Sequence, residues 1–94
     1  MKVFLSGGIS IDKNYRKKFY GTELFLSHYY KYIVLNPCVF PLGLSHDEYM
    51  HMCYAMIDVS DSVYFLKGWD DSVGSQAEMK YAIEHGKQVM YEEP

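Results

Sequence analysis

Short apolar segments alternate with longer amphipathic ones along the whole chain, and this alternation constrains the fold more than any other feature. The hydrophobic periodicity predicts four short strands with three helices between them. The strands are predicted over 2–5, 32–35, 62–66 and 88–91, and the helices over 15–30, 47–59 and 74–85. Strands joined by helices favour a parallel sheet with right-handed crossovers and helices on both faces. We therefore expect a three-layer, doubly wound α/β domain of four to five parallel strands, a Rossmann-like or flavodoxin-like fold of minimal size.

Length, charge and cysteine content narrow the classes of protein that this chain can represent. Its 94 residues fit one domain, residues 1–94, with a small core. A net charge of −3 argues against binding a nucleic-acid polymer through bulk charge. No apolar run approaches the ~20 residues of a membrane span, and the first residues lack the apolar core of a signal peptide. Cys38 and Cys53 form neither a CxxC pair nor a metal-ligand spacing, so we expect a cytoplasmic protein without a bound metal or a membrane contact.

The loop after the first predicted strand is the first candidate binding site. In doubly wound sheets the ligand lies outside the carboxyl ends of the strands. This loop contains Ser6, Gly7, Gly8, Ile9 and Ser10. Adjacent glycines let backbone N–H groups approach a sugar or an anion, and the start of the following helix favours negative charge. The alternative interpretation is a tight turn that needs glycine dihedral angles and binds nothing.

The segment after the third predicted strand supplies the second candidate site. Its small residues lead into a helix that carries Glu78 in its first turns. The carboxylate faces the carboxyl edge of the sheet if Gly74 and Ala77 pack against the backbone, whereas the alternative is an exposed acid that the helix dipole stabilises. Trp69, in the turn before this helix, either stacks on a base or anchors the loop.

Three motifs together resemble the nucleoside 2-deoxyribosyltransferase-like superfamily. They are the opening segment 2–10, the Asn36-Pro37 pair after the second strand, and the block 61–78, which ends in Ser-Val-Gly-Ser-Gln-Ala-Glu. Within that superfamily the chain is most similar to a branch of small phage and bacterial proteins, near the 2′-deoxynucleoside 5′-monophosphate N-hydrolases. The resemblance implies a small doubly wound fold, no cofactor, a homodimer or larger homo-oligomer, and a nucleoside or nucleotide as small-molecule ligand.

The same resemblance assigns roles to individual residues. Glu78 matches the glutamate nucleophile, and Ser72 and Gly74 match the Ser-x-Gly that precedes it, in which the serine contacts phosphate or sugar. The loop after the first strand matches the one that receives the sugar and phosphate. The predicted substrate-binding residues are therefore Ser6, Gly7, Gly8, Ile9, Ser10, Asn36, Trp69, Ser72 and Gly74.

Two positions depart from the family pattern. Phe4 stands where the family places a tyrosine that orients the glutamate, and Cys53 stands where it places an aspartate that protonates the leaving base. When a sugar–base bond breaks, a carboxylate stabilises the positive charge at the anomeric carbon and an acid protonates the departing nitrogen. Glu78 can fill the first role. A thiol is a weak acid for the second, and Asp58 is an uncertain substitute on another side of the helix.

Two functions of different classes follow from these residues. The first is cleavage or transfer at the N-glycosidic bond of a 2′-deoxynucleoside or its 5′-monophosphate, which Glu78, Ser72 and Gly74 favour. The second is non-catalytic binding of a nucleotide or nucleotide-derived signal on the same scaffold, which Phe4 and Cys53 favour. A purely structural accessory role is a third possibility, because fold alone does not determine function.

The helix predicted over 47–59 carries two apolar stripes, one more than packing on a sheet requires. The first stripe contains Tyr49, Met52, Cys53 and Met56, and the second contains Met50, Tyr54 and Ile57. The surplus stripe predicts a homodimer through this helix. The alternative is that the first helix or the loop over 38–45 covers it.

Overall fold

Four parallel strands form one sheet in the structure, a computed structural model that describes residues 1–9 and 13–93. The strands are β1 (Lys2–Ser6), β2 (Ile33–Leu35), β3 (Ser62–Phe65) and β4 (Gln88–Tyr91), in the order β2-β1-β3-β4. Val3 pairs with Val34 on one side and with Ser62 on the other, so β1 lies in the centre of the sheet beside β3. The predicted doubly wound α/β architecture is confirmed, with four strands.

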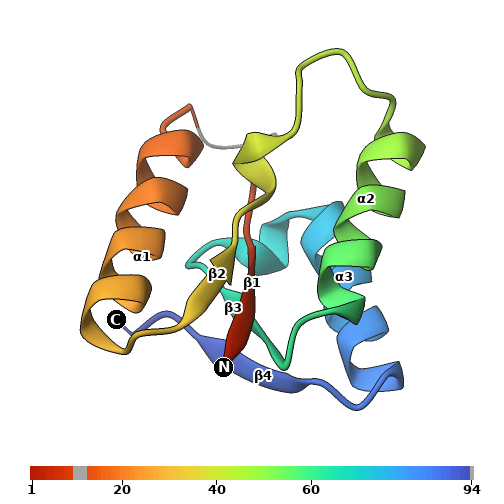
Figure 1. Ribbon diagram of the computed structural model, residues 1–94. Coiled ribbons are helices and arrows are strands. Elements are labelled where there is room, and N and C mark those ends of the chain that lie inside the picture. Colours follow the sequence, from red (N-terminus) through yellow and green to blue (C-terminus); the bar gives the residue numbers. More distant parts are fainter. Residues whose placement is uncertain (10–12, 94) are drawn as a thin grey trace.

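Three helices cover the two faces of this sheet (Figure 1). α1 (Tyr15–Tyr29) lies on one face, and α2 (His46–Asp58) and α3 (Val73–Glu84) lie on the other. The chain moves from β1 outwards to β2 and then back past β1 to β3, so right-handed crossovers place α1 and α2 on opposite faces. Within the described residues, no helix combines the length and the apolarity that a bilayer crossing requires.

Two 3₁₀ helices occupy segments that the sequence predicts as a loop and a turn. η1 (Pro37–Val39) follows β2, and η2 (Trp69–Asp71) follows β3. A proline at its first position and the Asn36 side chain, which accepts a hydrogen bond from Cys38 N–H, start η1. Helices of this length are too short to show a hydrophobic period, so the sequence pattern does not reveal them.

The central strands are buried on both faces, as parallel strands between two helix layers must be. On β1, Val3 and Leu5 pack in the cluster beneath α1, whereas Phe4 packs in the cluster beneath α2 and α3. Phe19 and Leu26 of α1 complete the cluster on that side of the sheet. This packing fixes the central strands relative to all three helices, and with them the loops at the carboxyl ends of the strands.

The second apolar stripe of α2 is packed within the chain and is not an exposed surface. Met50 and Ile57 are buried, and the Tyr54 ring stacks on Tyr81 of α3 with the ring centroids 4.3 Å apart. Helix α3 therefore covers this stripe, and neither the predicted second subunit nor the alternatives, the first helix and the loop over 38–45, are needed to do so. The homodimer stays a prediction. Its argument rested on an exposed second stripe of α2, and that stripe is covered within the chain.

Candidate functional site

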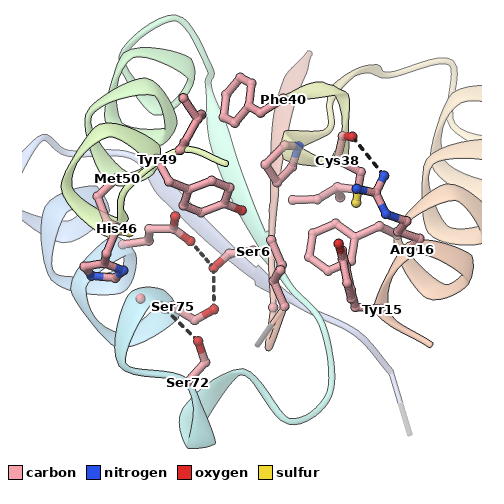
Figure 2. A pocket seen from close by; sticks show the side chains of 18 of the residues that line it. Ser6, Tyr15, Arg16, Cys38, Phe40, His46, Tyr49, Met50, Ser72 and Ser75 are labelled. Atoms are coloured by element: carbon pink, nitrogen blue, oxygen red, sulfur yellow. Dashed lines mark hydrogen bonds between the residues drawn. The ribbon is translucent and has the colours of Figure 1, made fainter. Parts of the chain in front are cut away.

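A cleft of about 280 Å³ opens at the carboxyl edge of the sheet, where doubly wound folds place their ligands. Figure 2 shows its two walls: Arg16 of α1 stands on one side of β1, and His46 of α2 and Ser75 of α3 stand on the other. Ser6, at the end of β1, lies between them. Small-molecule pockets measure roughly 300–1,000 Å³, so the volume of this cleft lies close to the lower end of that range.

The side chain of Glu78 lines this cleft and is almost completely buried. It lies in the second turn of α3 with 4% of its surface exposed. Ser6 Oγ donates a hydrogen bond of 2.5 Å to Glu78 Oε1, and Ser75 Oγ lies 3.0 Å from the same Ser6 oxygen. The interpretation of Glu78 as an exposed acid at a helix start is therefore wrong. Its carboxyl group is instead held in one orientation, as a nucleophile or a binding group requires.

The first turn of α3 is capped by Ser72 and contains small residues, so this end of the helix, with Glu78 one turn later, lies close to β1. Ser72 Oγ caps the helix by accepting a hydrogen bond of 3.3 Å from Ser75 N–H. A Cβ built on Gly74 would lie 3.5 Å from Met50 Sδ, so α2 passes directly beside this turn. Ser72 and Gly74 both line the cleft. Because the first residues of α3 are small, α2 and α3 pack closely at this edge of the sheet and the Glu78 carboxyl group lies between them and β1.

Burial changes the acidity of two neighbouring groups in this site. It raises the pKa of Glu78 from 4.5 to about 7, against the opposing effect of hydrogen bonds from Ser6 and Cys53. Burial, assisted by the Glu78 charge, also raises the pKa of the Cys53 thiol. Near neutral pH the Glu78 carboxyl group therefore exists in both protonation states, and such perturbed groups in clefts are candidates for functional roles.

Phe4 and Cys53, the two departures from the family pattern, lie behind the cleft. Both side chains are completely buried in the cluster beneath α2 and α3, and neither lines the cleft among the residues that the structure describes. Cys53 therefore meets Glu78 from the core side. Asp58, the uncertain substitute, instead accepts a hydrogen bond of 2.6 Å from the Tyr81 hydroxyl.

The loop after β1 is divided between the cleft and a neighbouring hollow. The described loop residues that line the cleft are Ser6, Gly7 and Ile9. Gly8 lines the hollow instead, and Ser10 lies outside the described residues. A Cβ on Gly7 would lie 3.1 Å from Leu66 Cδ1, so packing favours glycine there whatever the loop binds. The presence of glycine at position 7 is therefore explained in part by close packing in the turn, without any ligand.

Two of the predicted binding residues have structural contacts and do not line the cleft. The Asn36 side chain accepts a hydrogen bond of 2.9 Å from Cys38 N–H and donates one of 2.9 Å to Glu23. The Trp69 ring packs against Phe65 of β3, with the two ring centroids 4.9 Å apart. Asn36 thus shapes the turn into η1. The contacts of Trp69 are those of a loop anchor, which is the alternative role predicted for it.

Several polar side chains of the cleft are absent from the predicted set, among them Arg16, His46 and Tyr49. His46 is the first residue of α2, directly after the capping residue Ser45, and Tyr49 follows one turn later. On the opposite wall, Arg16 Nη1 donates a hydrogen bond of 3.4 Å to the Cys38 carbonyl oxygen (Figure 2). The helix-start signal around Ser45 places His46 at the functional edge of the sheet. No spacing rule connects these residues with Glu78, because they come from different crossovers.

The chemistry of the cleft follows from these groups. It offers a buried carboxyl group, an imidazole, a guanidinium group and several hydroxyl groups, together with aromatic rings. Among the residues that the structure describes, no group of three or more His, Cys, Asp or Glu side chains is arranged to hold a metal ion. The guanidinium suits an anionic group, the hydroxyls suit a sugar and the rings suit a planar base.

The whole folded unit corresponds to one protein family. A family model described as "Domain of unknown function (DUF4406)" matches residues 1–91, which include every strand of the sheet and every described residue of the cleft. No curated protein matches the chain.

Proposed function

The chain belongs to the DUF4406 family, a domain of unknown function, and on that premise we propose its activity from the geometry of the cleft. We propose that the protein cleaves or transfers at the N-glycosidic bond of a 2′-deoxynucleoside or its 5′-monophosphate, with Glu78 as the nucleophile. One observation carries this proposal: a buried carboxyl group lines a cleft of about 280 Å³ and is held by Ser6 at 2.5 Å.

The walls of the cleft match the parts of such a substrate. Phe40 and Tyr49, whose ring centroids lie 5.8 Å apart, offer aromatic surface against which a base can stack. The start of α3 at Ser72 favours a negatively charged group such as a 5′-phosphate, and Arg16 provides a cation on the facing wall. A nucleotide bound between these groups has its sugar beside Glu78.

The proposed reaction has two steps at the anomeric carbon. In the first, a Glu78 carboxylate oxygen bonds to that carbon while the bond from the carbon to the base nitrogen breaks, and the base leaves with the electron pair and takes up a proton. In the second, water attacks the same carbon, loses a proton and releases Glu78 and the free deoxysugar. A second base in place of water gives transfer. Because only the ionised carboxylate attacks, the rate rises as Glu78 ionises near its pKa of about 7.

His46 is the proton donor for the departing base in this proposal. Cys53 and Asp58 do not line the cleft among its described residues, whereas His46 does and stands on the same wall as Glu78. Imidazole is the side chain most often used for general acid catalysis. The carboxyl group and the proton donor then come from two adjacent helices, α3 and α2.

Non-catalytic nucleotide binding is the second candidate function. Phe4 and Cys53 lie in the core, so neither position provides the polar group that the resemblance would place in the cleft. A protein that retains the binding surface and lacks the reaction would have this arrangement. Both candidates share the ligand class and differ only in whether the base is released.

Incubation with a panel of 2′-deoxynucleosides and their 5′-monophosphates tests the proposal, with free base measured by chromatography. We expect base release by the wild-type protein, and we expect Glu78→Gln to abolish it while ligand affinity changes by about threefold or less, because only the charge is removed. Glu84→Gln is the matched control, since Glu84 is an exposed residue of the same helix. Binding without release selects the second function, and activity that survives in Glu78→Gln contradicts the first.

A further inference from the structure

The end of β1 contains a buried hydroxyl group where the preceding residues of the strand are apolar. Val3, Phe4 and Leu5 are completely buried, and Ser6, the last residue of the strand, has only 1% of its surface exposed. Side chains alternate between the two faces of a strand, so Ser6 lies on the same face as Phe4, which packs beneath α2 and α3. Phe4 has no polar atom in its side chain. Ser6 therefore supplies the buried hydrogen-bonding side chain of β1 on this face.

Three buried side chains meet through their oxygen atoms at this point. Ser6 Oγ lies 2.5 Å from Glu78 Oε1 and 3.0 Å from Ser75 Oγ (Figure 2). Ser75 is buried as completely as Ser6, and Glu78 is almost completely buried. A buried polar group is costly unless it has a hydrogen-bond partner, so each of these side chains depends on the others.

The number of hydroxyl protons sets the direction of these hydrogen bonds while Glu78 is ionised. A serine hydroxyl has one proton to donate, and a carboxylate can only accept. A carboxylate is also a stronger acceptor than a neutral hydroxyl, so Ser6 donates its proton to Glu78. The hydrogen bond between the two serines is then donated by Ser75. We call this pair, in which Ser75 donates to Ser6 and Ser6 donates to Glu78, the hydroxyl chain.

The other ionisable groups around the Glu78 carboxyl group come mainly from α2. Those that interact with it from this helix are Tyr49, Cys53 and Tyr54. Burial raises the pKa of all three, so each is neutral near pH 7. His46 of α2 and Arg16 of α1 stand in the two walls of the same cleft. A thiol is a weak donor, so Ser6 is the stronger of the two side chains, Ser6 and Cys53, that donate to this carboxylate.

We propose that Ser6 is the positioning residue of Glu78 and that Ser75 orients Ser6, so that the hydroxyl chain holds the carboxylate ionised and in one orientation. The catalytic consequence rests on the proposed function, because a nucleophile needs a fixed direction of attack. The hydroxyl chain forms and breaks no covalent bond. It lowers the share of Glu78 that is protonated near neutral pH, and it limits the rotation of the carboxyl group.

NMR spectroscopy of protein labelled at its glutamate carboxyl carbons tests the proposal without any substrate. The signal that disappears in Glu78→Gln belongs to Glu78, and its chemical shift is followed against pH. We expect Ser6→Ala to raise the pKa of Glu78 by about one unit, because a hydrogen bond to the charged form is lost. Ser75→Ala should raise this pKa by a smaller amount, since Ser6 then loses the donor that polarises its hydroxyl group.

Ser62→Ala is the matched control for these variants. Ser62 is a completely buried serine of the adjacent strand β3, pairs with Val3 of β1, and directs its hydroxyl to methionine sulfurs. This variant should leave the pKa of Glu78 within about 0.2 unit of its wild-type value. An unchanged pKa in Ser6→Ala, or an equal rise in Ser62→Ala, would overturn the proposal. An unchanged or lower pKa in Ser75→Ala would overturn the part assigned to Ser75.

The pH profile of base release separates orientation from ionisation. In Ser6→Ala the rise in rate should move to higher pH together with the pKa of Glu78. The rate at high pH should stay about tenfold or more below the wild-type rate, because the ionised carboxylate is no longer held in one direction. Full recovery at high pH would overturn the positioning role. If the pKa responds and the wild-type protein releases no base, the hydroxyl chain stands and the proposed reaction fails; base release with an unresponsive pKa has the opposite meaning.

Discussion

At the level of single residues, the buried carboxyl group of Glu78 links the candidate site to the stability of the fold. Its pKa rises from 4.5 to about 7 on folding, chiefly through burial. The folded state therefore holds this proton more tightly than the unfolded state does. The resulting stabilisation is complete below pH 4.5 and is lost as the pH rises through 7, and the full shift corresponds to about 3 kcal/mol.

Glu78→Gln should therefore alter the pH dependence of the unfolding free energy. Glutamine does not ionise, so between pH 5 and pH 8 the variant should lose about 2 kcal/mol less stability than the wild-type protein does. Urea unfolding at both pH values measures the difference. Glu84→Gln, at an exposed position, should follow the wild-type curve. Parallel curves for Glu78→Gln and the wild-type protein would show that burial does not shift this carboxyl group.

Residue-level predictions from the sequence succeed where the decisive contact is local and fail where it is distant. Ser72 and Gly74 line the cleft because the helix start itself positions them, and their part in substrate binding stays a prediction. The burial of Glu78 depends on Ser6, which lies 72 residues away in the chain, and no pattern within α3 encodes that contact. Trp69 and Asn36 follow strands at the correct edge and still miss the cleft, because their side chains pack on local neighbours.

At the level of elements, the start of α2 is the part of the cleft that depends most on helix capping. Ser45 Oγ accepts a hydrogen bond of 3.1 Å from Glu48 N–H, and Glu48 accepts one of 2.8 Å from Ser45 N–H, which is a complete capping box. This box directly precedes His46 and holds the end of the loop that closes the cleft. The capping box therefore fixes the start of α2 and, with it, the wall of the cleft that contains His46.

Ser45→Ala should lower the unfolding free energy by about 1 kcal/mol, the usual cost of losing an N-cap. It should also weaken binding of the cleft ligand, because the first turn of α2 loosens. Thermal unfolding and titration with a 5′-monophosphate measure the two effects. Ser27→Ala is a suitable control, since Ser27 lies within α1 and its hydroxyl bonds only to backbone carbonyls of its own helix. Unchanged stability in Ser45→Ala would show that the box contributes nothing to α2.

The helices were largely predictable because each is long enough to show a hydrophobic period, and the strands were predictable as short apolar runs between turn residues. The boundaries of α1 and α3 differ from the expected ones by a single residue at their ends, as frayed helix ends usually do. The two 3₁₀ helices were not predictable, because three residues cannot show a period. The packing of the second α2 stripe against α3 was not predictable either, because it joins two helices that are distant in the sequence.

At the level of the whole molecule, the packing of Tyr54 against α3 changes what a substitution there should do. Tyr54→Glu should lower the Tm by about 5–10 °C at every protein concentration, because it replaces the stack on Tyr81 with a partly buried charge. Met52→Glu, at a more exposed position of the same helix, should have a smaller effect. Scanning calorimetry over a range of concentrations measures this. A loss of Tm that grows with concentration would instead place Tyr54 in a subunit interface.

The arrangement of the sheet has a consequence for how the protein forms during translation. The central strand β1 is synthesised first, but its neighbour β3 emerges only after the chain has extended past both α1 and α2. Ser6 likewise forms its contact only when Glu78, 72 residues further along the chain, has been synthesised. A nascent chain on the ribosome can therefore pair β1 only with β2 until β3 has emerged, and contacts of such long sequence separation form slowly. The contacts that build the site therefore depend on the same distant segments as the sheet does.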